Sequence, residues 1–464
     1  MKPTTALLLV ITLMITCPGF FPKTQAVSPP PDGGYSGGNT AEGENALLSL
    51  TTGMYNSSVG LFSLLSNLEG NFNTAMGAGT LLANTAHENT ATGAGALLSN
   101  AIGHQNTANG AFALFSNTEG SFNTASGDQA LFSNITGNGN TVDGYQALFL
   151  NIEGDDNTAH GYRALYNNTA DHNTATGSVA LFHNTVGTEN TATGFRSLNQ
   201  NQTGGENTAN GAFALANNVS GALNTANGAS ALFDNSTGVQ NTAAGAFALS
   251  SLTAGDNNTA IGVSALINSS TGNGNIALGS FAGSSIETAS STICIGHNGE
   301  DVSNRCYISN IRGVIVGNGD GINVIIDSDG QLGTSNSSLR FKKDIKPMNQ
   351  TSEAILALKP VTFQYKNCDI KTPPQQFGLI AEDVAEVNPD LVVRDVGGEP
   401  LSVRYDAVNA MLLNEFLKEH RKVEKLEATV ARQQDQIEAL TTGLQKVTAQ
   451  VEMRERTPQM ANNE

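Results

Sequence analysis

Tryptophan is absent from this chain of 464 residues, and lysine is absent from residues 24–341. Residues 27–333 hold only four arginines, and the whole chain carries a formal net charge of −18. Nucleic-acid binding depends on Lys and Arg side chains that neutralise phosphates, and an acidic surface repels them. We therefore expect no nucleic-acid partner.

Long apolar runs are equally scarce, and the longest lies at the N-terminus. Residues 1–26 combine Lys2, the run ALLLVITLMI and a polar end at Ala26. This run is too short to span a bilayer and favours a secretory signal peptide, so we expect a secreted or cell-surface protein without a transmembrane segment. A lipoprotein attached through Cys17 is a weaker alternative. A Pro/Gly-rich linker is predicted at 27–38.

Cysteine is limited to four residues, and removal of the signal peptide would leave Cys294, Cys306 and Cys368. An odd number allows at most one internal disulfide, for which Cys294 and Cys306 are the candidates. The alternative is that these residues are small buried hydrophobic side chains. We expect no metal and no other cofactor.

What the sequence has in abundance is one repeated unit. Its leading Asn occurs fifteen times from Asn39 to Asn275 with a step of 17 residues, shortened to 16 at 73→89 and 157→173. Gly follows four residues later in all fifteen units, and Leu eight residues later in fourteen. A short fixed step is typical of stacked coils, so we predict a β-roll or β-solenoid over residues 39–283.

In the unit that begins at Asn207, small residues alternate with exposed ones. Asn207, Ala209 and Gly211 should face the interior, and Thr208 and Asn210 the outside. The run A-F-A-L-A that follows is predicted to be a second strand, and the Asn columns are expected to form stacked amides. An ice-binding face of outward threonines is a weaker alternative. The acidic residues form no column, so we expect no hydrolytic carboxylate pair in the repeats.

A second apolar column lies nine residues after the leading Asn. Because adjacent strand residues face opposite ways, we expect this column outside the coil if the Leu column fills it. An exposed ladder of this length exceeds the apolar patch that a soluble monomer tolerates, so another chain should bury it. Its members are Leu48, Leu65, Leu82, Leu98, Phe115, Phe132, Phe149, Tyr166, Phe182, Phe233 and Ile267.

Units such as NTATGAGALLSN (89–100) resemble the β-roll head repeats of trimeric autotransporter adhesins, although the step here is longer than in those heads. The resemblance implies three parallel chains that associate side by side.

Residues 284–333 lose the repeat, and we predict a β-rich connector there. Its expected strands lie at 292–296, 306–311, 314–317 and 322–327. Beyond it the composition changes, because residues 334–464 hold 17 Lys and Arg against 19 Asp and Glu.

The segments at 351–366, 375–393 and 403–426 predict the order helix, strand, strand, helix, strand and long helix. With the Ser-x-x-Arg-x-Lys start at 337–342, K-P-V-x-F-x-Y and G-L-I-A-E-D-V, they resemble the endosialidase-type intramolecular chaperone of phage tail spikes and fibres. We expect a small α+β domain at 334–451, followed by a polar tail at 452–464.

The last helix of this domain is expected to form a coiled coil over 412–451. Apolar residues recur there in alternating steps of three and four, with Glu419 and Gln433 as the polar exceptions. We name this row the seam. Its apolar members are Leu412, Phe416, Val423, Leu426, Val430, Ile437, Leu440, Leu444, Val447 and Val451. The composition alone does not separate a dimer from a trimer, whereas both resemblances imply a trimer.

The chaperone resemblance also implies a reaction. Its members hydrolyse the bond before the Ser that begins the domain, with a Lys five residues later as partner. The matching residues are Ser337 and Lys342, the scissile bond would be Asn336–Ser337, and Arg340 could hold the turn between them. Members that cleave often carry an acid after the Ser, where this chain has Ser338. Any enzymatic activity would thus be a single Ser/Lys self-cleavage.

We therefore predict an exported, adhesin-like homotrimeric fibre with a possible cell-surface or glycan receptor. The alternatives are a phage-derived tail-fibre protein and a purely structural surface fibre whose trimerisation domain stays uncleaved.

Overall fold

The computed structural model describes residues 35–311, 323–327, 330–334, 337–366, 374–395 and 397–455. The chain divides into two compact units, 1–314 and 315–464. The predicted signal peptide, residues 27–34 of the linker, the strand at 314–317, Cys368 and the tail after 455 lie outside the described residues.

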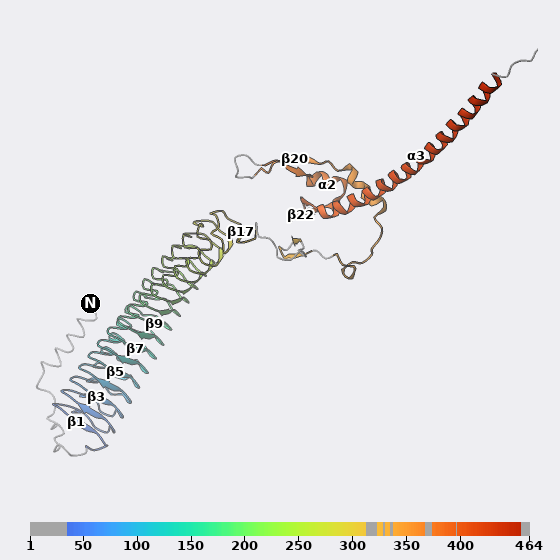
Figure 1. Cartoon of the computed structure of the whole chain (residues 1–464). Coiled ribbons are helices and arrows are strands. Elements are labelled where there is room, and N and C mark those ends of the chain that lie inside the picture. Colours follow the sequence, from blue (N-terminus) through green and yellow to red (C-terminus); the bar gives the residue numbers. More distant parts are fainter. Residues whose placement is uncertain are drawn as a thin grey trace, which may run out of the picture. The chain divides into compact units, whose positions relative to one another are not determined.

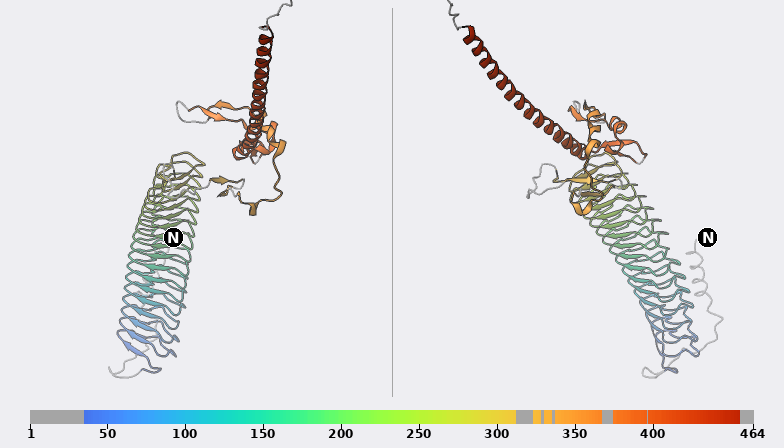
Figure 2. Two further views of the ribbon diagram at one scale, coloured as in Figure 1. Left: turned by 45° about the vertical axis from the view of Figure 1, so that its right-hand side comes forward. Right: turned by 90° about the vertical axis from the view of Figure 1, so that its right-hand side faces the viewer.

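The first unit is a solenoid whose coils each contribute one strand to a parallel sheet (Figure 1). Consecutive strands pair in register, so that Ala192 lies beside Ala209 and Ala209 beside Ala226. Figure 2 shows the same stack from two further sides. The predicted mainly β solenoid of 17-residue coils is confirmed. Within residues 35–311 its strands are β1 Thr40–Glu42, β2 Ser57–Val59, β3 Thr74–Met76, β4 Thr90–Thr92, β5 Thr107–Asn109, β6 Thr124–Ser126, β7 Thr141–Asp143, β8 Thr158–His160, β9 Thr174–Thr176, β10 Thr191–Thr193, β11 Thr208–Asn210, β12 Thr225–Asn227, β13 Thr242–Ala244, β14 Thr259–Ile261, β15 Ile276–Leu278, β16 Ile293–Ile295 and β17 Cys306–Ile308.

The second strand predicted in each repeat is wrong, because the run that carries the Leu is a series of turns. Phe213 and Leu215 have φ values of 61° and 51°, which no strand allows. The Ala214 N–H bonds back to Gly211 O in its own coil, while the Leu215 N–H bonds to Ala231 O in the next. The Leu side chain still fills the interior, since Leu215 is fully buried.

The Gly four residues after the leading Asn is required by close stacking. Gly211 has a φ of 140°, and a Cβ atom there would lie 2.6 Å from the carbonyl of Gly228 in the next coil. Only glycine tolerates both the conformation and the contact.

Buried asparagine side chains form a ladder along the interior, as the sequence predicts. Asn207 donates from its backbone N–H and from Nδ2 to Asn190 Oδ1, both at 3.1 Å. Its Nδ2 also donates to Gly221 O at 2.8 Å, which closes the turn of its own coil. Asn224 repeats the pattern on Asn207. Each coil thereby satisfies polar groups that its neighbour buries.

A second amide ladder lies eleven residues after the first and has breaks. Within it, Asn117 Nδ2 donates to Asn100 Oδ1 at 2.7 Å. The Oδ1 atoms of Asn67, Asn151 and Asn235 have no hydrogen-bond partner among the described residues. The first two precede the 16-residue coils, and the third precedes Leu252, which has no amide. A deletion of one residue therefore interrupts this ladder. In the first ladder the backbone N–H groups of Asn89 and Asn173 keep their bonds to the coil before, while their Nδ2 groups donate to Asn84 and Asn168 Oδ1 instead.

The second apolar column is half-buried within a single chain, unlike the Leu column, which is fully buried. Its cover by another chain stays a prediction. Its rings stack on one another at centroid distances of 5.0 Å for Phe115–Phe132 and for Phe132–Phe149. The stack continues through Tyr166 to Phe182. Ring stacking thus removes much of the apolar area that the sequence assigned to another chain.

The parallel sheet continues past residue 283 into the predicted connector. The runs at 292–296 and 306–311 supply β16 and β17, the last two strands of the sheet. Thr292 replaces the leading Asn, and its N–H donates to Asn275 Oδ1 at 2.9 Å. Asp301 Oδ1 accepts the N–H groups of Glu287, Thr288 and Ala289, which holds a turn without the repeat's glycine.

The candidate disulfide between Cys294 and Cys306 does not form. Cys294 lies opposite Tyr307 and Ile293 opposite Cys306, so the two cysteines face opposite sides of the sheet. Cys294 is buried in the alanine column, Cys306 is exposed, and both are free. Burial raises the pKa of the Cys294 thiol, as the alternative of a small buried residue requires.

The second unit has the predicted α+β character, with one strand more than predicted before the long helix. Val384, Leu391, Val392, Val403 and Met411 form its buried core. The first predicted helix is a 3₁₀ helix, and the strands form short antiparallel hairpins. The elements are β18 Val324–Ile326, β19 Leu332–Thr334, η1 Leu339–Phe341, η2 Asn349–Ala357, β20 Val361–Phe363, β21 Gln376–Gly378, α2 Ala381–Val387, η3 Pro389–Leu391, β22 Val392–Arg394, β23 Pro400–Val403 and α3 Tyr405–Glu455.

Replacement of Asn207 by Ala should destabilise the solenoid. The buried backbone N–H of Asn224 would lose its acceptor, which costs about 1–3 kcal/mol for that group alone. Asn210→Ala is the matched control, because Asn210 is exposed on the outward face of the same strand. Thermal melts followed by circular dichroism should show a lower Tm for Asn207→Ala only, and equal Tm values would contradict the ladder's role.

Candidate functional site

Ser337 and Lys342, the residues predicted from the sequence, lie together at the start of the second unit. Lys342 Nζ donates a hydrogen bond to Ser337 Oγ at 3.2 Å. The 3₁₀ turn η1 separates them, and the N–H of Lys342 bonds to Leu339 O, so the chain turns back and brings the two side chains together. A lysine in this position is within reach to accept the serine proton.

The surroundings of the pair differ from the prediction in two respects. Arg340 does not bridge the pair but stacks on Phe341, with Cζ 4.8 Å from the ring centroid. Ser337 and Lys342 are both exposed in the single chain. Asn336, on the other side of the predicted scissile bond, lies outside the described residues.

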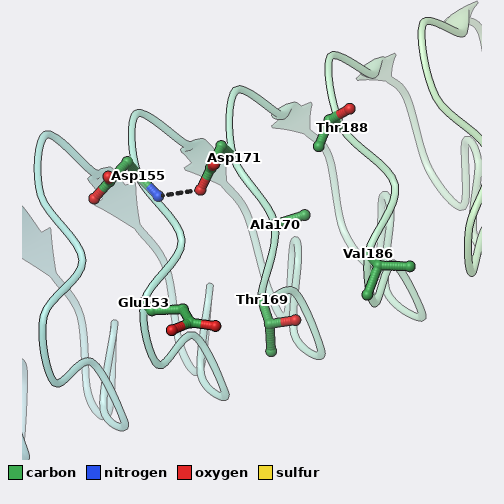
Figure 3. A pocket seen from close by; sticks show the side chains of 7 residues that line it. All are labelled: Glu153, Asp155, Thr169, Ala170, Asp171, Val186 and Thr188. Carbon is green, nitrogen blue, oxygen red and sulfur yellow. Dashed lines mark hydrogen bonds between the residues drawn. The ribbon is translucent and has the colours of Figure 1, made fainter.

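A groove of about 470 Å³ on the solenoid is the other candidate (Figure 3). It lies where the 16-residue coil 157–172 leaves a shorter turn. Figure 3 shows Asp155 and Asp171 in adjacent coils with Glu153 apart from both. Asp171 Oδ1 accepts the N–H of Asp155 at 2.8 Å, so this carboxylate is engaged by the backbone. The groove offers no facing pair of acids.

That contact belongs to a third polar ladder, which sequence reasoning missed. At the position fifteen residues after the leading Asn, or fourteen in the 16-residue coils, a side-chain oxygen accepts the backbone N–H of the preceding coil, and at His87 the ring Nδ1 accepts it. Asn138 Oδ1 accepts the N–H of Ser121, and Asp155 Oδ1 accepts the N–H of Asn138. The residue type varies between Asn, Asp, Ser and His, so the column has no single-letter signature.

No group of three or more His, Cys, Asp or Glu side chains in the described part of the chain is placed to hold a metal ion. No helix there is both long and apolar enough to cross a membrane.

The comparisons bear on the segment that begins at the Ser/Lys pair. The family model described as chaperone of endosialidase matches residues 337–393, with Ser337 as its first residue. Residues 337–393 are an endosialidase-type chaperone segment. No curated protein and no solved structure matches the chain.

A buried polar network attaches this chaperone segment to α3. Ser352 is fully buried in η2 and donates to Glu415 Oε1, and Asn414 Nδ2 donates to Ser352 Oγ at 2.6 Å. Lys418 Nζ lies 2.6 Å from Glu415 Oε1 and 3.3 Å from Glu353 Oε1. Nothing in the sequence relates these residues, because more than sixty positions separate η2 from its partners.

Lys418 Nζ also donates to Ser352 Oγ at 3.4 Å, which makes a second Ser/Lys contact. Hydrogen bonds from Lys418 and Ser352 lower the pKa of Glu415, and the hydrogen bond to Glu415 raises the pKa of Lys418. The raised pKa favours the protonated lysine, which donates hydrogen bonds and does not accept the proton of Ser352.

The packing of α3 on the chaperone segment should weaken in acid. The pKa of Glu415 is lower in the folded chain than in the unfolded chain, so its contribution is complete above the unfolded value of about 4.3. It is lost as the pH falls through the lowered folded value. Denaturation of the intact protein at pH 7 and in steps below pH 4 should show this loss in the C-terminal unit.

Glu415→Gln keeps the shape of the side chain but cannot titrate, so it should be less stable at pH 7 and less sensitive to acid. Glu424→Gln, at an exposed carboxylate of the same helix, is the control. An unchanged acid response in Glu415→Gln would exclude Glu415 as its source.

Proposed function

We propose that the protein is an exported homotrimeric fibre of adhesin-like type, assembled by its C-terminal chaperone unit. The observation that carries the proposal is the seam of α3. All ten of its apolar side chains are between 48% and 74% exposed in the single chain. A regular apolar row on a 51-residue helix is stable in water only when other helices cover it.

We expect the α3 helices of two further copies of the chain to cover the seam. The heptad spacing of the seam fits parallel helices in register, as identical chains provide. The resemblance of the repeats to trimeric heads and the match to a chaperone found in tail spikes support three chains rather than two.

The repeats supply the reason for a dedicated assembly unit. Coils of nearly equal sequence pair as well with a shifted neighbour as with the right one, so register is weakly specified. Non-local parallel pairing is also slow and prone to aggregation. A C-terminal unit that associates first would align three chains before their solenoids complete folding.

We also propose that the chaperone unit releases itself. Ser337 Oγ attacks the carbonyl carbon of Asn336 while its proton passes to the Lys342 amine. The C–N bond breaks, the Ser337 amino group gains a proton, and water hydrolyses the resulting ester to a carboxylate on Asn336.

A lysine accepts a proton only in its neutral form, which burial favours. The pair is exposed in the single chain, so assembly must provide the cover, and cleavage should follow trimerisation. A fibre that assembles but stays intact would be the purely structural alternative.

Export rests on the signal-like residues 1–26. A signal peptide also favours the exported fibre over a phage-derived tail fibre, because a tail fibre folds inside the host cell and needs no such leader.

Assembly can be tested through the seam. Leu426→Asp combined with Leu440→Asp would place carboxylates in the core of the coiled coil, so a chain lacking residues 1–26 should sediment as a monomer or aggregate. Ala428→Asp with Thr442→Asp adds the same charge on the opposite side of α3 and should leave a trimer. A stable monomer of the unaltered sequence would overturn the proposal.

Cleavage can be tested by mass measurement of the assembled protein, which should contain a fragment of residues 337–464. Ser337→Ala and Lys342→Ala should remain full length. Lys342→Arg should also remain intact, because a guanidinium keeps the charge but does not give up its proton. Lys343→Ala, at the exposed neighbour, should cleave normally. A wild-type trimer that stays uncleaved would contradict the self-cleavage proposal but not the proposal of a trimeric fibre.

A further inference from the structure

The solenoid carries an unusual pair of arginines. Residues 35–311 contain 18 Asp and Glu but only three Arg. Two of these, Arg163 and Arg196, occupy the same position of coils that are separated by one coil. Since parallel strands lie about 4.8 Å apart, the two positions are about 10 Å apart along the stack. No carboxylate of the described residues forms an ion pair with either.

Arg163 is held in one orientation by its neighbours. Its Nε donates to Gln146 Oε1 at 2.9 Å, and Gln146 Nε2 donates in turn to Gln129 Oε1 at 2.7 Å. Its Cζ lies 5.1 Å from the ring centroid of Tyr162 and 5.5 Å from that of Tyr166. These contacts fix the guanidinium plane and use only the Nε donor, which leaves the Nη groups for a ligand.

Arg196, two coils later, has one ring contact, with Cζ 5.4 Å from the ring centroid of Phe195. The coil between contributes Ser178 and Val179, so the row of rings five residues after the leading Asn, Tyr145 and Tyr162, is interrupted there before Phe195. Tyr162 is 47% exposed and Phe195 45% exposed on either side of the interruption. We name Tyr162, Arg163, Ser178, Val179, Phe195 and Arg196 the arginine strip.

We propose that the arginine strip binds an acidic polysaccharide in which a carboxylate-bearing sugar alternates with a neutral one. A guanidinium matches a carboxylate in a bidentate contact. A pyranose ring is about as long as one coil step, so a chain laid along the stack would present carboxylates at every second coil, where Arg163 and Arg196 lie. The aromatic side chains would pack against the apolar faces of the sugars.

The negative charge of the rest of the solenoid favours a polysaccharide with a carboxylate on every second sugar over a polymer that is charged on every unit. The surrounding carboxylates repel a polymer that is charged on every unit, whereas the strip supplies two positive charges at one interval. The site would give the proposed fibre a ligand, but it requires neither cleavage nor the trimer.

The test is binding of the full chain to hyaluronan, in which glucuronate alternates with a neutral sugar. Dextran supplies an uncharged polymer, and polyglutamate supplies carboxylates without sugars. Hyaluronan should bind and the other two should not. Arg163→Gln and Arg196→Gln should each weaken binding by about tenfold or more, because each removes a charge-assisted contact.

Arg305→Gln is the matched control, since it removes one charge from an exposed arginine elsewhere on the same solenoid. It should leave hyaluronan affinity unchanged. Equal losses in all three variants, equal binding of polyglutamate, or no binding of hyaluronan would overturn the proposal. Sedimentation of the same samples reports the oligomeric state separately, so failure of the site and failure of the fibre remain distinguishable.

Discussion

The buried amide ladder that starts at Asn39 is the interaction on which the rest of the solenoid depends. Asn56, for example, donates its backbone N–H and its Nδ2 to Asn39 Oδ1 in the coil before, and its Nδ2 also donates to Gly70 O in its own coil. An isolated coil would bury these polar groups without partners, so no coil is stable alone. The ladder also fixes the close approach that makes glycine necessary at positions such as Gly211.

The ends of the stack show how this dependence is resolved. Tyr35 packs against the interior at the N-terminal end, and its hydroxyl donates to Ala41 O. At the other end the N–H of Thr292 donates to Asn275 Oδ1, as the N–H of a leading Asn would, and the Thr292 hydroxyl donates to Val302 O. The repeat disappears from the sequence before the solenoid ends because the hydrogen bonds continue after the residue types change.

The sequence was sufficient for the features that depend on one residue type at one position. The period, the inward Asn and Ala columns and the ladder follow from spacing and side-chain chemistry. The left-handed conformation of Leu215 could not be predicted, since leucine seldom adopts it and only the stack makes it favourable. In the second unit, the Ser337–Lys342 contact was predictable from a local motif. The Ser352–Glu415–Lys418 network was not, because it joins residues far apart in sequence.

Because the inward columns alone satisfy the folding requirements, the outward positions are free to differ between coils. The two 16-residue coils illustrate the limit of this freedom. They interrupt the second amide ladder at Asn67 and Asn151 but keep the backbone hydrogen bonds of the first, and the solenoid persists. Arg163 and Arg196 stand at a position where other coils carry Asn, Gly, Gln, Phe, Ser or Val, so their identity is not needed for stacking. Selection for a ligand can therefore act on such positions one coil at a time, while the repeat keeps a constant distance between equivalent positions of consecutive coils.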